Sequence, residues 1–241
     1  MDLPYYLSVR VFLRGTNMFA YCLKVTSNWY QVEVCSSKTT QWKTIGKPFF
    51  EPNVLHFKNG VFCKGAIHWL KTSSICLYFD VDNELMKSTP EPPQWKQCPS
   101  YSHEYFGRAN DHLYFVVKRR LPNCTLLQMK ANYSGWFVKC VIDLDRLAKN
   151  FPFMARNFDY TPEFLPHYEC NVLCVAGLEG ESDIDEGDVE LLVSMPGKIV
   201  RFNPRTNASR EIGRLPLYPY NDSVWYKDFS VNEYFETICP V

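Results

Sequence analysis

The chain has 241 residues, of which 26 are basic and 26 acidic, so its formal net charge at pH 7 is zero. A binder of duplex nucleic acid usually carries a basic excess or a basic stripe, and the densest basic run here is only residues 118–120. The sequence also lacks an uninterrupted run of about 20 apolar residues that could span a bilayer. We therefore expect neither nucleic acid nor a membrane as a partner.

Residues 1–27 form a strand-like segment in which Asp2, Arg10 and Arg14 interrupt the apolar residues. A secretory signal needs a basic start followed by a clean apolar stretch, and this segment lacks that pattern. The ten cysteines of the chain lie mostly within apolar strand-like runs, where a free thiol packs as a small apolar group. We expect reduced thiols and a cytoplasmic or nuclear protein.

Strand signals dominate the chain. Apolar and polar residues alternate with a period of two at residues 30–34, 77–81 and 136–141, and further strand-like runs lie at residues 112–118, 171–176, 189–194 and 199–202. Turn-forming residues separate strands at 36–37, 82–83, 110–111, 196–197 and 203–204. Only residues 144–150 are predicted to be helical, with Asp143 as the N-cap. Together with a 16% share of aromatic residues, this pattern predicts an all-β fold.

Four similar hairpins recur along the chain, each consisting of a strand, a polar turn and a second strand. They lie at residues 32–45, 78–86, 127–138 and 199–212. Their spacing of roughly 45 to 75 residues is close to the length of one four-stranded propeller blade with insertions. We therefore expect propeller-type antiparallel blades, complete or incomplete in number, with each hairpin as the outer half of a blade. A β-sandwich is the alternative.

An acidic, glycine-rich stretch at residues 177–188 is the first candidate for a ligand site. Asp183, Asp185 and Asp188 supply oxygen ligands suited to calcium, and Gly187 permits a sharp turn. An EF-hand loop requires a ligand where Gly187 stands and a glycine where Asp188 stands, so the spacing does not match. We interpret the stretch as a solvated or partner-facing loop.

Cys170 and Cys174, with His167 nearby, are the second candidate, because this spacing occurs in zinc sites. Such sites usually combine two ligand pairs, and no second pair of Cys or His residues is found elsewhere in the sequence. Residues four apart in a strand share one face, so the two thiols are expected to pack together. The sequence therefore predicts no metal and no cofactor.

The third candidate is a catalytic site. The sequence contains no G-x-S-x-G nucleophile elbow and no G-x-G-x-x-G or Walker-type loop. The five histidines, at positions 56, 68, 103, 112 and 167, are scattered through the chain. Nucleophilic catalysis needs a base and an orienting group beside the nucleophile. We therefore assign no catalytic residue and expect a protein that is not an enzyme.

The stretch at residues 60–70, GVFCKGAIHWL, contains residue types that occur both in active sites and in tightly bent sheets. Gly60 and Gly65 remove side chains where strands bend or approach closely. Trp69 is a large apolar body suited to a core between sheets. We interpret the stretch as the inner strand pair of one blade, with His68 held by a structural hydrogen bond.

This stretch and three later motifs together resemble the F-box associated domain of plant F-box proteins. The first motif, which runs on into SSICLYFDVDNELMKSTPEPP, matches at Gly60, Val61, Gly65, Ile67, His68, Trp69, Tyr78, Phe79, Asp80, Glu84, Pro90, Pro92 and Pro93. The others are YFGRANDHLYFV, MKANYSGWFVKCVIDLD and PGKIVRFNPRT, at residues 105–116, 129–145 and 196–206. In the motif at residues 105–116, Asn110 stands where the family usually has glycine. The match spans residues 28–216, and we assign residues 28–241 to this domain.

The resemblance implies a kelch-like, propeller-type fold and a role as the target-recognition domain of a substrate receptor in an SCF ubiquitin ligase complex. In that family the domain has no catalytic activity of its own and binds the protein chosen for ubiquitination. An N-terminal F-box contacts the ligase adaptor, and we expect that contact only if an F-box is present, because the strand-like residues 1–27 do not resemble one. The alternative is a kelch-like propeller enzyme or carbohydrate-binding protein.

The sequence assigns no individual protein-binding residue. Recognition surfaces of propellers lie mainly in loops on one face. The loops at residues 90–99 and 180–188 are therefore the candidate recognition elements, because their composition indicates exposure. The identity of the target is not encoded in any of these patterns.

Overall fold

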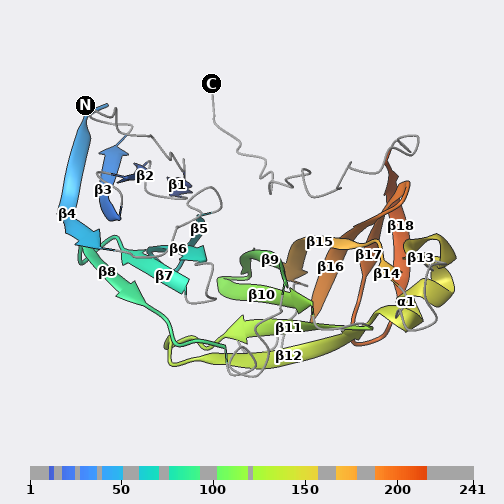
Figure 1. The fold of residues 1–241 in the computed structure, drawn as a ribbon. Coiled ribbons are helices and arrows are strands. Elements are labelled where there is room, and N and C mark those ends of the chain that lie inside the picture. Colours follow the sequence, from blue (N-terminus) through green and yellow to red (C-terminus); the bar gives the residue numbers. More distant parts are fainter. Residues whose placement is uncertain are drawn as a thin grey trace. The chain divides into compact units, whose positions relative to one another are not determined.

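The computed structural model describes the strands, turns and one helix that make up most of the chain (Figure 1). The described residues are 11–13, 18–24, 28–36, 40–50, 60–70, 76–92, 102–118, 122–156, 167–177 and 188–215. The chain divides into two compact units. One comprises Met1–Val117 with Thr125–Lys139, and the other Lys118–Cys124 with Cys140–Val241.

The first unit contains two complete four-stranded sheets. The strands of the first sheet, in the order β1-β2-β3-β4, are β1 (Val11–Leu13), β2 (Met18–Lys24), β3 (Trp29–Ser36) and β4 (Trp42–Phe50). Those of the second, in the order β5-β6-β7-β8, are β5 (Val61–Cys63), β6 (Ala66–Leu70), β7 (Cys76–Asp80) and β8 (Leu85–Ser88). Every neighbouring pair in both sheets is antiparallel.

A third four-stranded sheet has strands in both units, and a fourth lies in the second unit. The third consists of β9 (Ser102–Ala109), β10 (His112–Lys118), β11 (Asn123–Met129) and β12 (Trp136–Asp143). The fourth consists of β15 (Asn171–Gly177), β16 (Val189–Met195), β17 (Lys198–Phe202) and β18 (Ser209–Arg214). Between them come α1 (Leu144–Asn150), the 3₁₀ turn η3 (Pro152–Met154), β13 (Ala155–Arg156) and β14 (His167–Tyr168).

Each four-stranded sheet follows the order of the chain, which is the strand arrangement of a propeller blade. The all-β, propeller-type prediction is therefore confirmed, whereas a sandwich would distribute neighbouring strands between two sheets. The four hairpins predicted from the repeat are the third and fourth strands of the four sheets, β3–β4, β7–β8, β11–β12 and β17–β18. The expected boundary at residues 27–28 lies between β2 and β3, which pair from Lys24↔Tyr30 to Met18↔Ser36.

The core of the first unit lies between successive sheets. Four buried residues of the first sheet and three of the second form one cluster, Tyr30, Val32, Val34, Ile45, Ile67, Trp69 and Phe79. Two buried residues of the second sheet and six of the third form another, Cys63, Cys76, Leu113, Phe115, Val117, Leu127, Met129 and Trp136. Strand β6 is buried from Ala66 to Trp69, on both of its faces. Burial on both faces explains why residues 66–70 are apolar except for His68.

The β5–β6 turn shows that Gly65 is needed for its backbone conformation. Cys63 pairs with Ala66, and the two residues between them have φ of 47° at Lys64 and 73° at Gly65. This is the signature of a type I′ hairpin, which requires positive φ at both central positions. Of the two reasons expected for glycine here, a bend or a close approach of strands, the turn requires the first. The second does not apply, because a Cβ at Gly65 would meet only the Asp82 carboxylate, at 3.6 Å.

Replacing Gly65 by alanine should lower the free energy of unfolding by about 1 kcal/mol, because an L side chain is strained in the left-handed region. Gly213 is the matched control, since its backbone is not in that region and a Cβ there would meet Ile199 at an ordinary 3.8 Å. Urea unfolding of Gly65→Ala and Gly213→Ala measures both effects. An equal loss in the two variants would contradict this account of the turn.

Polar side chains close the β7–β8 turn and cap the start of α1, as expected. The Asp80 carboxylate accepts hydrogen bonds from the Asn83 backbone at 3.1 Å and the Asn83 side chain at 2.9 Å, closing the turn before β8. In the second unit, the Asp143 carboxylate accepts from the backbone amides of Asp145 and Arg146 at 2.9 and 3.2 Å. Asp143 is therefore the N-cap of α1, as predicted.

Candidate functional site

The cluster around His68 is part of the scaffold. His68 is fully buried on β6, and its Nδ1 donates to the Val61 carbonyl oxygen at 3.2 Å, which is the predicted structural hydrogen bond. Its ring stacks on Tyr78 of β7 at 5.4 Å and on Tyr133, in the turn between β11 and β12, at 5.5 Å. These contacts join the second sheet to the third. They leave His68 no path to a substrate.

The electrostatics of this region also oppose catalysis. Burial lowers the pKa of His68 to about 4, against a smaller opposing effect of the Val61 and Ala66 carbonyls, so the ring is neutral at pH 7. Burial raises the pKa of the Cys63 thiol to about 11 and raises that of Cys76 as well. A thiol acts as a nucleophile only as the thiolate, so both cysteines are inert packing residues at neutral pH.

The described cysteines give no metal site. Among the cysteines whose side chains the structure describes, seven form no disulfide, Cys35, Cys63, Cys76, Cys124, Cys140, Cys170 and Cys174. Cys170 precedes β15 and the strand shifts register between Val172 and Cys174, so the simple alternation expected to place Cys170 and Cys174 on one face does not apply. Within the described segments no three His, Cys, Asp or Glu side chains lie close enough together to hold a metal ion. The side chain of His167 lies outside the description.

The two loops predicted from composition fall largely outside the described residues. Residues 178–187 and 93–101 are not described. Of the acidic loop, Asp188 is described, and its carboxylate pairs with Arg205 at 2.7 Å. Of the proline-rich loop, Pro90 is exposed and Pro92 is buried. Their roles in recognition stay predictions.

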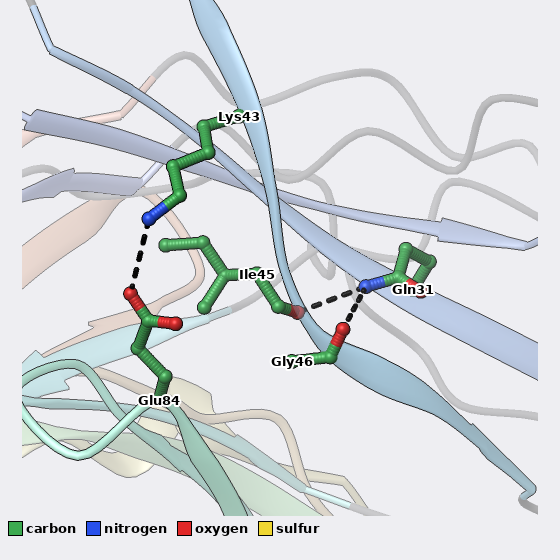
Figure 2. Close-up of polar contacts among 5 residues, drawn as sticks. All are labelled: Gln31, Lys43, Ile45, Gly46 and Glu84. Carbon is green, nitrogen blue, oxygen red and sulfur yellow. Dashed lines mark hydrogen bonds and ion pairs between the residues drawn. The ribbon is translucent and has the colours of Figure 1, made fainter.

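Strands β3 and β4 provide a different candidate surface. Their pairing contains an irregularity beside it. Tyr30 pairs with Phe49 and Val32 with Ile45, so three residues of β4 lie opposite Gln31 alone. The Gln31 side chain donates to the Ile45 carbonyl at 2.8 Å and reaches that of Gly46 at 3.5 Å, as Figure 2 shows. A buried side-chain amide thus satisfies backbone groups that the ladder leaves open at this bulge.

Gly46 is required by this bulge for two reasons. Its φ is 66°, and a Cβ on it would lie 3.2 Å from the backbone oxygen of Glu84, at the turn before β8. The Glu84 side chain meets Lys43 of β4 at 3.5 Å in the same region (Figure 2). The bulge therefore lets the edge strand approach the second sheet on one face.

The opposite face of β3 and β4 carries exposed aromatic side chains. Trp29, Trp42 and Phe50 are 46%, 48% and 54% exposed, and we call these three residues the aromatic face. Trp29 is paired in register with Phe50, and the two rings form an edge-to-face contact at 5.6 Å. Trp42 lies on the same face but pairs with Cys35, at the other end of β3, so Trp29 and Phe50 are the neighbouring pair of the aromatic face. Neighbouring exposed rings are typical of a protein-binding surface, whereas single ones are not.

Sequence reasoning missed the aromatic face. Tyr30 and Trp29 are adjacent aromatic residues, yet Tyr30 is 1% exposed and Trp29 is 46% exposed. Alternation along β3 predicts that these residues lie on opposite faces. It does not predict which face the second sheet covers. The missing information was the packing partner of the sheet.

Comparison with known proteins adds one informative relative. An F-box protein of Arabidopsis thaliana is 27% identical over 206 residues, which are 79% of this chain and 46% of that protein. This similarity supports a relation to plant F-box proteins, and the chain spans less than half of the relative's length. No family model matches the chain.

Solved structures give weaker likenesses. An oligogalacturonate lyase from Vibrio parahaemolyticus has 10% identity and a TM-score of 0.44, over 88% of this chain and 65% of its own. Sqt1 of Saccharomyces cerevisiae has 8% identity and a TM-score of 0.45, over 86% and 48%. The helices in the described segments are too short or too polar to cross a bilayer.

Proposed function

We propose that this chain is the target-recognition domain of an SCF-type substrate receptor, with an F-box associated, kelch-like domain that binds protein and has no catalysis of its own. The observation that carries the proposal is the similarity to an F-box protein over 79% of the chain. Two of the motifs that resemble the family contribute residues to one contact, the stacking of His68 on Tyr133. Such a protein would act in the cytoplasm or nucleus.

The aromatic face is the surface that we assign to target binding. Tryptophan and other aromatic side chains contribute large contact areas at little conformational cost and dominate the energetics of many protein interfaces. The neighbouring β4 bulge disrupts the regular edge, which disfavours uncontrolled pairing with other strands. A shaped surface with exposed rings therefore suits a specific partner better than a regular edge strand would.

Removing the aromatic pair should weaken target capture. The chain is expressed with an affinity tag in plant cells, and captured proteins are quantified for the unchanged chain, for Trp29→Ala with Phe50→Ala, and for Phe153→Ala. The double variant should lower target affinity at least tenfold, because each hot-spot ring contributes more than about 1 kcal/mol. Phe153 is 81% exposed in the other unit, so its variant controls for the loss of an exposed ring.

A ubiquitination assay completes the test. The F-box segment of the Arabidopsis relative is joined to the N-terminus of the chain, and ubiquitination of each captured protein is followed with the reconstituted ligase. Ubiquitination that depends on Trp29 and Phe50 supports the proposal. Captured proteins that are never modified, or that bind the double variant as well as the unchanged chain, would count against it.

A further inference from the structure

The fourth sheet has one covered face and one open face. Leu191 and Val193 of β16 and Val200 and Phe202 of β17 are all at most 3% exposed, and the pairs Leu191↔Phe202 and Val193↔Val200 place them on a common face. The intervening residues lie on the opposite face, where Arg201 is exposed, Leu192 and Ile199 are half-buried and Ser194 is 1% exposed. This side is therefore covered at Ser194 and exposed around Arg201, and we call it the open face.

Two arginines lie side by side on this open face. Arg201 of β17 is directly opposite Arg210 of β18 in the strand register, and both are exposed. We call Leu192, Ile199, Arg201 and Arg210 the arginine face. Side chains directly opposite on antiparallel strands have Cβ atoms about 5 Å apart, and like charges in such pairs are destabilising. The register of β17 and β18 thus places two like charges opposite each other.

The local charges leave this pair incompletely neutralised. Residues 188–215 contain five basic and three acidic side chains. Glu190 pairs with Arg201 at 3.3 Å, whereas Lys198 and Arg214 share Glu211, and Arg205 pairs with Asp188. Among the described residues, Arg210 has no ion-pair partner. The open face therefore carries two guanidinium groups and one carboxylate, that of Glu190, which pairs with Arg201.

We propose that the arginine face binds an acidic, extended segment of the recruited protein, with alternating carboxylate and apolar side chains. Carboxylates would pair with the Arg201 and Arg210 guanidinium groups, which match their planar geometry. The half-buried Leu192 and Ile199 would contact the apolar side chains of the same segment. This inference rests on the proposed function for the origin of the segment, and the chemistry of the face determines its class.

A peptide probe tests the inference without the ligase. Binding of fluorescently labelled acetyl-Glu-Leu-Glu-Leu-Glu-Leu-Glu-amide to the full chain is followed by anisotropy at several salt concentrations. The joint substitution Arg201→Gln and Arg210→Gln should weaken binding at least tenfold and flatten its salt dependence, because guanidinium–carboxylate attraction is screened by salt. Arg214→Gln is the matched control on the same strand. Its side chain is 89% exposed and pairs with Glu211, and its loss should change affinity less than twofold.

Each of the other binding outcomes overturns the inference. Equal weakening by Arg214→Gln would show that net charge alone attracts the peptide. Equal binding of a peptide with lysine in place of glutamate, or no binding of the acidic peptide, would remove the role of the arginines. Tighter binding of a matched phosphoserine peptide or of a short RNA would assign the face to phosphate instead. Failure of the ubiquitination assay with success here would refute the proposed function and leave the arginine face standing.

Discussion

Replacing Trp69 by alanine should lower the free energy of unfolding of the first unit by about 4 kcal/mol. Trp69 is 1% exposed on β6 and belongs to the core between the first two sheets. Its neighbours in that core come from both sheets, among them Tyr30 and Val32 of β3 and Phe79 of β7. Removal of the indole ring leaves a cavity among these residues, and the cavity adds to the cost of the lost apolar burial.

The measurement is urea unfolding of the full chain under reducing conditions, with Trp29→Ala as the matched control. Trp29 is also a tryptophan of the first unit, but it lies on β3 and is 46% exposed. Its loss should cost about 1 kcal/mol, mainly through the edge-to-face contact with Phe50. Similar losses in the two variants would show that the first two sheets do not pack through Trp69.

The sequence predicts the elements of this fold well because each depends on local chemistry. The apolar strand-like run at residues 112–118 predicts a strand with the bounds that the structure has, and the place of Asp143 before a short helical segment predicts the cap of α1. The third and fourth strands of each sheet were predicted from polar turns between strands. All of these signals lie within about 15 residues of chain.

What the sequence does not predict depends on contacts between distant residues. His68 stacks on Tyr133, 65 positions later, and no local pattern links them. The bulge opposite Gln31 is equally hidden, because its reason is a buried amide that bonds two carbonyls across the strand pair. The exposure of Trp29 and the pairing of Arg201 with Arg210 follow from register and from which face is covered. Both candidate binding surfaces therefore required the structure.

Burial also distinguishes a scaffold motif from a binding site in this chain. GVFCKGAIHWL combines residues that recur in active sites, yet Cys63, His68 and Trp69 are all buried. Recognition of proteins needs exposed side chains on a rigid support. Strand β6 provides the support for the first unit, and the exposed rings lie on β3 and β4.

Lowering the pH from 7.5 to 5 should cost the protein about 2 kcal/mol of folding stability through His68 alone. Burial holds the pKa of His68 near 4 in the folded state, below its ordinary 6.5. The unfolded chain therefore binds a proton at His68 as the pH falls through 6.5, while the folded protein does not. Stability from this group is fully present above pH 6.5 and decreases down to pH 4.

His68→Phe removes the titration but keeps a ring that can stack between Tyr78 and Tyr133. The difference in unfolding free energy between the unchanged chain and this variant should shift by about 2 kcal/mol in favour of the variant between pH 7.5 and 5. The other histidines are common to both proteins and cancel. Asp80 does not interfere, because its salt-bridged carboxyl, with a folded pKa of about 2, loses its contribution only below pH 4. Parallel pH curves would mean that the folded protein protonates His68, and that its ring is not sealed between the second and third sheets.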